Sequence, residues 1–577
     1  MEKWFVAAKK ADFQSIGKKF HIDPVTARLI RNRDVVGDDA IEEYLYGGRK
    51  SLNDPHLLKD CGKTAGIIKE KIEESKKIRI IGDYDIDGVN ATYILYRGLK
   101  RCGAQVDVEI PDRMKDGYGL NRNLIHLAYE EGVDTILTCD NGIAAVDEIG
   151  EAKSLGMTVL ITDHHELQEK LPPADAIVNP KQPDCDYPYK SLCGAAVAYK
   201  LMSCLYETCG IPAEEADVFL EFAAIATVGD VMDLTGENRI IVKEGLKLLN
   251  HTENPGLKAL IRANGLEESD ISSYHIGFVL GPCINASGRL DTAKRALALL
   301  QEEDYRKAEE LAQTLKELND ERKAMTLQGL EKAVELIENS SLKEDKVLVV
   351  YLPECHESLA GIIAGRIRER YHKPVFVLTD AAEGVKGSGR SIEAYNMFAE
   401  MSKCADLFSK FGGHPMAAGL SLPKENVEVF REKINRLAVL TEEDFIPKIM
   451  IDVPMPVSYI TEHLVEELHV LEPFGKGNTK PVFAEKNLNL LSARILGKNK
   501  NVIKMQVQNG LGTVMDAMYF GDVDVFRGYL NEKFGYAETE KLFWGRENAV
   551  TLSVTYYPGI NEYRGNRTIQ IVVQNYM

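Results

Sequence analysis

The chain lacks the features that would mark a membrane, secreted or zinc-ribbon protein. No apolar run among its 577 residues approaches the roughly 20 residues of a membrane helix, so no membrane association is expected. The N-terminus carries Glu2 at once and only a short apolar patch before Lys9, unlike a secretory signal. None of its 10 cysteines forms a Cys-x-x-Cys pair. Together these absences predict a cytoplasmic protein with reduced thiols.

An excess of positive charge is also missing. A net charge of −18 counts against a protein that coats nucleic acid non-specifically. A local groove remains open, because the segment 476–504 is strongly basic and carries a single acid, Glu485. The alternative for this segment is an ordinary solvated face. Its basic residues are Lys476, Lys480, Lys486, Arg494, Lys498, Lys500 and Lys504.

Length and pattern divide the chain into several segments. Residues 1–50 look like short helices without evident chemistry, and residues 51–270 alternate strands and helices. Residues 271–345 form a connector with a long helix, and residues 346–446 form a second α/β domain. Residues 447–577 hold short β-rich runs between turns, which is typical of an OB-fold barrel. The expected fold class is α/β: two α/β domains joined by a long helix, followed by a C-terminal β-barrel.

The first α/β domain shows the rhythm of a parallel sheet. Apolar runs at 78–81, 135–138 and 157–161 read as strands, with helical patterns between them. Such a sheet carries helices on both faces and binds ligands beyond the carboxyl ends of its strands. An aspartate follows each run two residues later, so these carboxylates are expected at one edge of the sheet.

A long helix is predicted at 303–338, where few breakers interrupt an apolar stripe. It would span roughly 50 Å at 1.5 Å per residue, a length that more often joins two domains than lies within one. In the second domain, 346–351 and 375–378 read as strands on either side of a helix. The glycine-rich stretches 386–390 and 411–419 are expected as loops.

Acidic side chains at the strand ends favour a site for two divalent metals. Asp83, Asp85 and Asp87 lie two residues apart, so on an extended chain they share one face, and cations would relieve their repulsion. The alternative is an ordinary turn rich in Asp and Gly. Asp140 either joins the same site or caps the following helix.

Imidazoles join the acids at the next strand end. In Asp163-His164-His165 the first His can ligate, the second can reach substrate, and Asp163 can orient an imidazole. The alternative is a loop pair of histidines. Asp230 and Asp233 follow an apolar, helix-like run, where Asp233 would cap or brace it. Oxygen ligands with one or two nitrogens and no cysteine favour manganese or magnesium. Two such metals about 3.5–4 Å apart would activate a water and stabilise the leaving oxygen.

From about residue 50 to residue 575, the sequence resembles the DHH phosphoesterases. Within them it is most similar to the RecJ family of bacterial single-stranded-DNA exonucleases. The resemblance implies that residues 51–270 are the DHH domain and residues 346–446 the DHH-associated domain. The motifs that carry it are 82–88, 117–120, 140–142, Asp163-His164-His165, 179–181, 281–289, 386–390, 411–414 and Pro473-Phe-Gly-Lys-Gly-Asn478.

The resemblance also implies residue roles. One metal would be held by Asp87, Asp140, His164 and Asp230, and the other by Asp85, with Asp140 bridging and Asp83 near. His165 would lie against the scissile phosphate, so the catalytic residues would be Asp83, Asp140 and His165, with Asp163 and Asp233 supporting the ligands. The phosphate- and DNA-binding residues would be Arg113, Arg289, Ser388, Gly389, Arg390, Gly412, Gly413 and His414.

Two motif residues have an interpretation independent of the family. A Gly-Ser-Gly loop lets backbone N–H groups approach an anion, and Arg390 can grip that anion with two hydrogen bonds. The alternative is an ordinary turn. His414 could contact a phosphate across the cleft, or could instead pack on Pro415 as a loop residue.

Two positions depart from the family's usual pattern. Cys283 stands where RecJ proteins usually carry Arg, which would remove one positive charge from the DNA path. Cys355-His-Glu-Ser-Leu-Ala-Gly361 replaces the usual Trp-His-x-Gly-Val-Ile-Gly. Both departures bear on substrate contacts, including recognition of a 5′ end, while none of the implied metal ligands departs from the pattern.

The expected function is a metal-dependent exonuclease that degrades single-stranded DNA from its 5′ end to mononucleotides, in DNA repair and recombination. Candidate stacking and basic contacts in the barrel are Tyr556, Tyr557, Tyr563, Arg564 and Arg567, although for any single tyrosine the favoured interpretation is barrel core or rim. Expected partners are single-stranded DNA and, through the family, a helicase and a single-strand-binding protein; the chain would act as a monomer. One alternative is a phosphodiesterase for short oligonucleotides or cyclic dinucleotides, and another is a non-catalytic DNA-binding scaffold.

Overall fold

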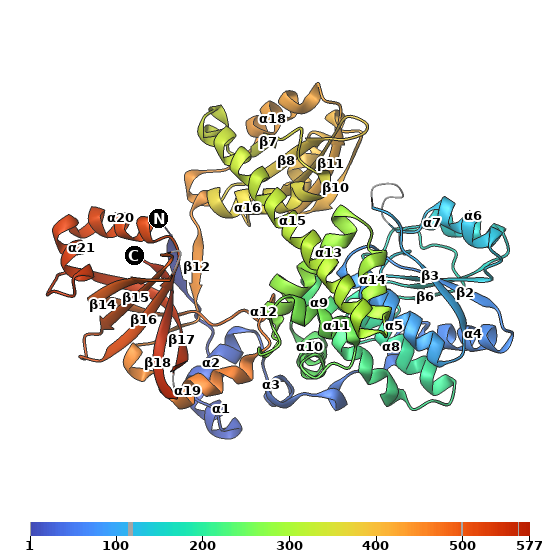
Figure 1. Cartoon of the computed structure of the whole chain (residues 1–577), viewed down its shortest axis with the longest axis horizontal. Coiled ribbons are helices and arrows are strands. Elements are labelled where there is room, and N and C mark those ends of the chain that lie inside the picture. The colour runs from blue at the N-terminus through green and yellow to red at the C-terminus, as the bar shows by residue number, and fades with distance from the viewer. Residues whose placement is uncertain (1, 114–118, 498–499, 564) are drawn as a thin grey trace. The chain divides into compact units, whose positions relative to one another are not determined.

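The computed structural model describes residues 2–113, 119–497, 500–563 and 565–577 (Figure 1). It divides into two compact units: unit 1 is Arg49–Pro447, and unit 2 combines Glu2–Gly48 with Lys448–Met577. The sequence predicts residues 1–50 as a separate helical segment, whereas here Glu2–Gly48 shares a unit with the C-terminal residues. Parts of three predictions lie outside the described residues: Gly117 and Tyr118 of one motif, Lys498 of the basic segment, and Arg564.

Unit 1 begins with the predicted parallel sheet, whose strand order is β3-β2-β4-β5-β6. Each neighbouring pair is parallel; for example, Ile80 pairs with Leu137, which pairs with Leu160. The strands are β2 (Lys77–Ile81), β3 (Gln105–Glu109), β4 (Thr135–Cys139), β5 (Thr158–Thr162) and β6 (Ala176–Val178).

Helices cover both faces of this sheet because alternate strand residues point to opposite sides. Ile80 and Leu137 belong to the core that includes α4, α5, α8 and α9, while Ile81 and Ile136 face α6 and α7. These helices are α4 (Cys61–Glu73), α5 (Ile86–Arg101), α6 (Arg122–Glu130), α7 (Val146–Ser154), α8 (Gly194–Thr208) and α9 (Leu220–Gly229). The layered α/β arrangement is therefore as predicted.

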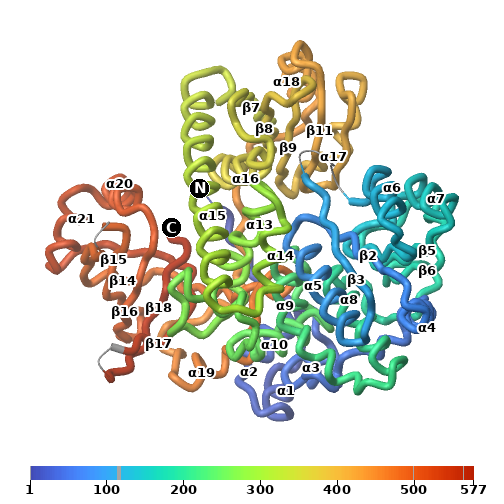
Figure 2. The backbone as a smooth tube through the Cα atoms, turned by 45° about the vertical axis from the view of Figure 1, so that its right-hand side comes forward, coloured from blue at the N-terminus to red at the C-terminus, as the bar shows by residue number. Residues whose placement is uncertain are grey.

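A helical connector leads to the second domain of unit 1. It consists of α10 (Gly236–Leu249), α11 (Pro255–Ala263), α12 (Ser273–His275), the π-helical turn η4 (Ile276–Leu280), α13 (Gly281–Leu290), α14 (Lys294–Gln301) and α15 (Tyr305–Glu338). The long helix predicted at 303–338 is α15, which starts after Asp304, whose side chain accepts hydrogen bonds from two first-turn amides. In Figure 2, α13 and α16 both lie along α15.

The second domain is a five-stranded sheet in the order β10-β11-β9-β8-β7. Both segments predicted as glycine-rich loops are strands here: 386–390 lies in β9, and 411–419 forms most of the β10–β11 hairpin. The elements are β7 (Leu348–Tyr351), α16 (Ala360–Tyr371), β8 (Val375–Asp380), β9 (Val385–Arg390), α17 (Met397–Ser402), β10 (Lys410–His414), β11 (Ala417–Leu422) and α18 (Asn426–Leu437).

Packing explains why glycine is needed in β9 even though no loop is present. A Cβ on Gly387 would lie 2.3 Å from Leu378 Cδ2, and one on Gly389 would lie 2.4 Å from Met397 Sδ. The two glycines therefore face the core, and Ser388 and Arg390 alternate to the other side of the strand.

Unit 2 is the predicted barrel. Its strands close a ring in the order β14-β15-β16-β18-β17, because β17 pairs with β14 as well as with β18. The strands are β13 (Val453–Pro454), β14 (Phe483–Leu496), β15 (Val502–Gln508), β16 (Val514–Phe520), β17 (Thr551–Tyr563) and β18 (Asn566–Tyr576), with helices α19 (Glu462–Glu467), α20 (Val523–Phe534) and α21 (Tyr536–Phe543).

The N-terminal residues complete unit 2 in two ways. Strand β1 (Lys3–Val6) pairs with β12 (Lys448–Ile451), and helices α1 (Phe13–Phe20), α2 (Pro24–Asn32) and α3 (Asp38–Tyr46) add to the barrel's core. Asn478 links the parts: its Oδ1 accepts hydrogen bonds from Arg33 (2.7 Å) and Tyr44 (2.9 Å). Among the described residues, no helix is both long and apolar enough to cross a bilayer.

Candidate metal centre and phosphate-binding surface

The loop after β2 folds three carboxylates into a small space. Asp85 caps α5, because its Oδ1 accepts hydrogen bonds from the amides of Asp87 (2.9 Å) and Gly88 (3.0 Å). A Cβ on Gly88 would lie 2.5 Å from the backbone oxygen of Asp83, so only glycine allows this turn. The predicted Asp- and Gly-rich turn and the predicted acidic cluster are thus the same structure.

The carboxylate of Asp87 is fully buried and is held by the N-terminus of α8. Its two oxygens accept hydrogen bonds from the amides of Gly194 (2.6 Å) and Ala195 (2.7 Å). The positive end of a helix stabilises such an anion. Gly194 also leaves room for Asp140, since a Cβ there would lie 2.7 Å from the Cβ of Asp140. Nothing in the sequence analysis pointed to these α8 amides.

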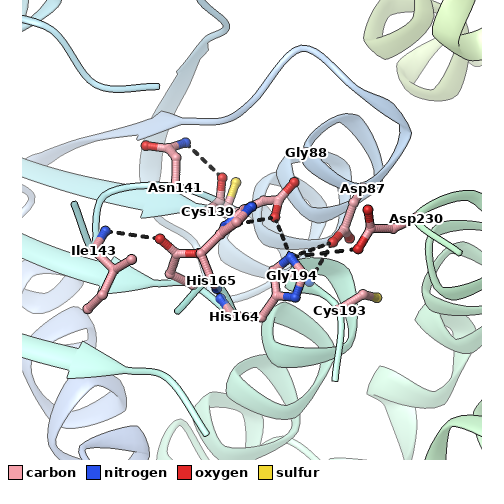
Figure 3. A network of polar contacts seen from close by, with 12 residues as sticks. Asp87, Gly88, Cys139, Asn141, Ile143, His164, His165, Cys193, Gly194 and Asp230 are labelled. Carbon is pink, nitrogen blue, oxygen red and sulfur yellow. Dashed lines mark hydrogen bonds and ion pairs between the residues drawn. The ribbon is translucent and has the colours of Figure 1, made fainter. Parts of the chain in front are cut away.

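His164 lies among carboxylates from three different elements. Its Nε2 is 3.5 Å from Asp87 Oδ2 and 3.8 Å from Asp230 Oδ2 (Figure 3). The same nitrogen is 3.1 Å from Asp140 Oδ1. Asp140 follows β4 with a left-handed backbone (φ 60°) and does not cap the next helix, whose N-cap is Ala145. Residues distant in the sequence therefore meet at the carboxyl edge of the sheet, as the strand pattern predicted.

Asp163 orients the other imidazole of the Asp-His-His motif. Its Oδ1 lies 2.7 Å from His165 Nδ1 and accepts the backbone N–H of His164, while Oδ2 accepts the N–H of Ile143 at 2.9 Å. Burial alone would lower the pKa of His165, but the hydrogen bond and charge of Asp163 outweigh it and raise that pKa to about 9. Asp163 therefore holds the motif in place through the His165 ring and the His164 backbone.

The clustered carboxylates oppose one another's ionisation. Burial, followed by the charge of Asp85, raises the pKa of Asp83 to about 8. Burial and the charge of Asp87 raise the pKa of Asp85, and burial with the charges of four neighbouring acids raises that of Asp140. Asp83 Oδ1 is buried with no hydrogen-bond partner among the described residues. Buried acids in this state are stabilised by a bound cation.

The donor atoms fall into groups that suit two divalent metals. In the described part of the chain, Asp87, His164 and Asp230 have ligand atoms within 4.8 Å of one another, as do Asp83, Asp85 and Asp140. A third such group joins Asp140 to His164 and His165, so Asp140 is shared between neighbouring groups. Carboxylate oxygens with imidazole nitrogen and no thiolate are typical of magnesium or manganese. Asp233 is in none of these groups; it lies just beyond Asp230, and its backbone oxygen accepts a hydrogen bond from Asn238.

Helix α13 packs on the acidic loop through one face, which explains the spacing of the 281–289 motif. Asn285 Oδ1 accepts the N–H of Ile86 at 2.9 Å, and a Cβ on Gly288 would lie 2.3 Å from the oxygen of Tyr84. Asn285 and Gly288 received no predicted role, although their spacing from Arg289 was a usable signal. The same packing places Arg289 next to this acidic loop.

Two of the predicted arginines lie close to Tyr84 in that loop. The Arg113 guanidinium lies 5.1 Å from the centre of the Tyr84 ring, and Arg289 Nη1 donates to the backbone oxygen of Ser358 at 2.9 Å. Burial, then the charges of Arg113 and Arg322, lower the pKa of Arg289 to about 10. Positive charges that repel one another in this way suit an anionic ligand.

The remaining predicted phosphate-binding residues lie on the sheet of the second domain. Across the strands, Ser388 pairs with Gly419, which pairs with Gly412. Because the side chains in this row are small, the surface of the sheet is recessed here. Gly413 lies beside Ala418 and the exposed His414 beside Ala417. Arg390 is half-buried and burial lowers its pKa, while a Cβ on Gly361 of α16 would lie 3.0 Å from its Nη2.

This surface forms one wall of a cavity of about 790 Å³. Arg113 contributes from the first domain, and Lys386, Ser388, Lys410 and Gly412 contribute from the second. The structure therefore brings Arg113 and the Ser388 strand to one cavity, whereas His414 is not part of its lining. A cavity lined by Arg and Lys is suited to an anionic chain.

One sequence interpretation needs correction, and for two barrel tyrosines the favoured alternative is confirmed. Cys283 is fully buried and faces α15, where Asn319 Nδ2 lies 3.4 Å from its Sγ, so it is not on an open DNA path. In unit 2, Tyr556 and Tyr557 are buried in the barrel, and the Tyr556 hydroxyl donates to the oxygen of Met455. These two tyrosines are core residues, which leaves Arg567 as an exposed candidate from that group, paired here with Glu466.

Comparison with known proteins decides the family. Residues 77–227 match the DHH family N-terminal domain, 344–439 the DHHA1 domain and 451–575 the RecJ OB domain. The single-stranded-DNA-specific exonuclease RecJ of Escherichia coli is 31% identical over 576 residues, covering 96% of each chain. The chain belongs to the RecJ family.

Other RecJ proteins support this assignment. RecJ of Bacillus subtilis is 39% identical over 512 residues, which are 88% of this chain but 64% of that longer protein. The crystal structure of Thermus thermophilus RecJ with Mn²⁺ superposes with a TM-score of 0.82 at 26% identity, covering 100% of this chain and 79% of that one. A structure of the same protein with Mg²⁺ gives 0.77. The metals named in both structures agree with the ligand chemistry of the present RecJ family member.

Proposed function

We propose that this chain is a metal-dependent exonuclease that hydrolyses single-stranded DNA from its 5′ end and releases mononucleotides, in DNA repair and recombination. The observation that carries the proposal is the sharing of Asp140 between neighbouring groups of candidate ligands, one with Asp83 and Asp85 and one with His164. Asp87 and Asp230 would complete the second group. Two bound manganese or magnesium ions would supply an activated water and neutralise charge on the leaving oxygen.

The protein's own groups would position the phosphate. Arg113, Arg289 and Arg390 would bind its oxygens, and Ser388 would donate a hydrogen bond from the sheet surface. His165, held by Asp163, would lie against the scissile phosphate. The row of glycines at Gly412 and Gly419 would let the strand approach the backbone closely.

The supply of substrate would depend on other proteins. We propose that a helicase and a single-strand-binding protein present single strands to a monomeric, cytoplasmic enzyme. The barrel of unit 2 would bind the strand through basic residues of 476–504, which include exposed Lys476 and Lys486.

The test is digestion of single strands labelled at the 5′ or the 3′ end, with manganese or magnesium, and with duplex DNA and RNA as controls. The proposal predicts that 5′-labelled mononucleotides appear first from single-stranded DNA. Cleavage confined to dinucleotides would favour a short-substrate phosphodiesterase instead. Binding without any cleavage in either metal would favour a scaffold.

A further inference from the structure

Another cavity of unit 1, of about 290 Å³, has no part in the roles described above. Glu221, in the first turn of α9, lines it, whereas Asp230 lies at the other end of that helix, roughly 13 Å away at 1.5 Å per residue. The cavity also has aromatic walls. Tyr93 of α5 and Phe222 of α9 both line it, and the centres of their rings are 4.5 Å apart.

Glu221 brings a carboxylate oxygen without a hydrogen-bond donor to this cavity. Its side chain is buried, with only 7% of the residue exposed, and Oε2 has no hydrogen-bond partner among the described residues. The hydrogen bond from the Thr252 hydroxyl therefore reaches the other oxygen. Thr252 is itself oriented, because its Oγ1 accepts the backbone N–H of Asn254 at 3.2 Å. A buried acceptor left over in this way calls for a donor from a bound molecule.

The lining of the cavity is negatively charged. Besides Glu221 it contains three carboxylates and one base, which are Glu253, Glu302, Glu303 and Arg97. Arg97 Nη1 lies 2.9 Å from Glu303 Oε1, so its charge is already paired at the exposed rim. The charges that act on Glu221 are those of Glu253 and Lys258. Four carboxylates against one guanidinium give the lining a negative potential, which attracts a cation.

The chemistry of the cavity favours an organic ammonium over a metal ion or a guanidinium. Glu221 belongs to none of the groups in the described part of the chain that could hold a metal ion. A guanidinium pairs best with both oxygens of a carboxylate, whereas here Thr252 already takes one, and a compact ammonium needs only the other. The faces of Tyr93 and Phe222 would attract its positive charge and cover its methylene groups.

We propose that this cavity binds a linear aliphatic polyamine, with one primary ammonium donating to Oε2 of Glu221. Further ammonium groups of the same molecule would lie among the carboxylates of the rim. Glu253 and Glu303 are exposed there, so a ligand with several positive charges fits better than the single charge of a lysine side chain. The site is separate from the metal centre and does not depend on the proposed function.

The protonation of Glu221 gives binding a measurable signature. Burial raises the pKa of Glu221 to about 7, and an adjacent ammonium would favour the charged form, so binding should release a proton. About half a proton should be released at pH 7, and affinity should rise about tenfold from pH 6 to pH 8. The titratable groups that face Glu221 are Tyr93 of α5, Glu253 and Lys258.

The experiment is a calorimetric titration of the full-length protein with spermidine, at saturating Mg²⁺ and without DNA. Proton release is read from the change in binding heat between buffers of different ionisation enthalpy. Glu221→Gln keeps the shape of the side chain but removes its charge. We expect it to weaken binding about 10- to 100-fold and to abolish both the proton release and the pH dependence. Glu214→Gln, at an exposed carboxylate seven residues earlier, is the matched control and should bind as wild type does.

The two sources of an alkylammonium are separated with the amide of Nα-acetyl-lysine, which mimics a side chain of a partner protein. It should bind at least about tenfold more weakly than spermidine, and equal affinity would overturn the assignment to a polyamine. Equal affinity of wild type and Glu221→Gln, or binding without proton release, would reduce the effect to general attraction by a chain of net charge −18 and would overturn the proposal. The absence of any binding would overturn it as well.

Discussion

His165 Nδ1 lies 2.7 Å from Oδ1 of Asp163, while the same carboxylate also accepts backbone N–H groups of the motif. One buried acid therefore fixes both the path of the loop and the direction of the ring. His165 itself remains partly exposed, with 44% of its side chain accessible, so it is oriented yet open to a substrate.

We predict that Asp163→Ala lowers kcat by about 10- to 100-fold, the usual cost of losing a group that orients a metal ligand or catalytic imidazole. If Asp163 acts mainly through His165, its removal from a His165→Ala enzyme should cost little more. The double-mutant cycle on kcat measures this coupling. Fully additive losses would show that the two residues act independently.

Gly194 is predicted to tolerate no side chain. In Gly194→Ala the new Cβ would press on Asp140, 2.7 Å away, and displace a candidate bridging ligand. A misplacement near 1 Å can cost about a hundredfold in rate, so cleavage should fall at least that far. Gly66→Ala, at a helix position with open space around it, should keep wild-type activity. Unchanged cleavage in Gly194→Ala would mean that Asp140 is not held where the structure has it.

Arg113 should contribute to the salt dependence of strand binding. Each phosphate contact to a single strand adds about 0.7 to the slope of log affinity against log salt, so Arg113→Gln should reduce the slope by about that amount. Arg97→Gln, which removes an exposed arginine paired with Glu303, should leave the slope unchanged. The slopes come from binding titrations between low and moderate salt. Equal slopes for wild type and Arg113→Gln would remove Arg113 from the strand's path.

Glu221 gives a pH dependence of stability away from the metal centre. Burial raises its pKa in the folded protein to about 7, against 4.5 for an exposed glutamate, and the Thr252 hydrogen bond offsets only part of this. The folded state therefore holds a proton that the unfolded state releases, and the free energy of unfolding should fall as pH rises from about 4.5 to about 7.

Glu221→Gln should remove that dependence. At pH 8 it should stabilise unit 1 by up to about 3 kcal/mol relative to wild type, and at pH 5 by little. Urea unfolding at the two pH values measures this, with the exposed Glu214→Gln as the control. The same small effect at both pH values would show that Glu221 ionises freely in the folded protein.

The strand-end acids were predictable because a parallel sheet gathers its carboxyl ends at one edge. Apolar runs before Asp83, Asp140 and Asp163 were enough to place these residues together. The amides that hold Asp87 were not predictable, because they come from α8, more than a hundred residues later, through a contact that leaves no local pattern. Asn285 differs, because it lies in the 281–289 motif and its spacing from Arg289 could have pointed to it.

Glycine misled the prediction of the second domain. Gly387 and Gly389 suggested a loop, but they lie in strand β9. Glycine is needed there because Leu378 and Met397 of the core leave no room for a Cβ. Local propensity could not reveal this, since the need for glycine arises from tertiary packing. Likewise, the pairing of β1 with β12 joins segments more than 400 residues apart, so residues 1–50 looked like a separate segment.

The most direct test of the account is to locate manganese by anomalous diffraction in crystals of the full chain grown with Mn²⁺. The account predicts two peaks, one bounded by Asp83, Asp85 and Asp140 and one by Asp87, His164 and Asp230, with both weakened in Asp140→Asn. No anomalous peak among these side chains at saturating Mn²⁺, or peaks only elsewhere on the chain, would contradict it.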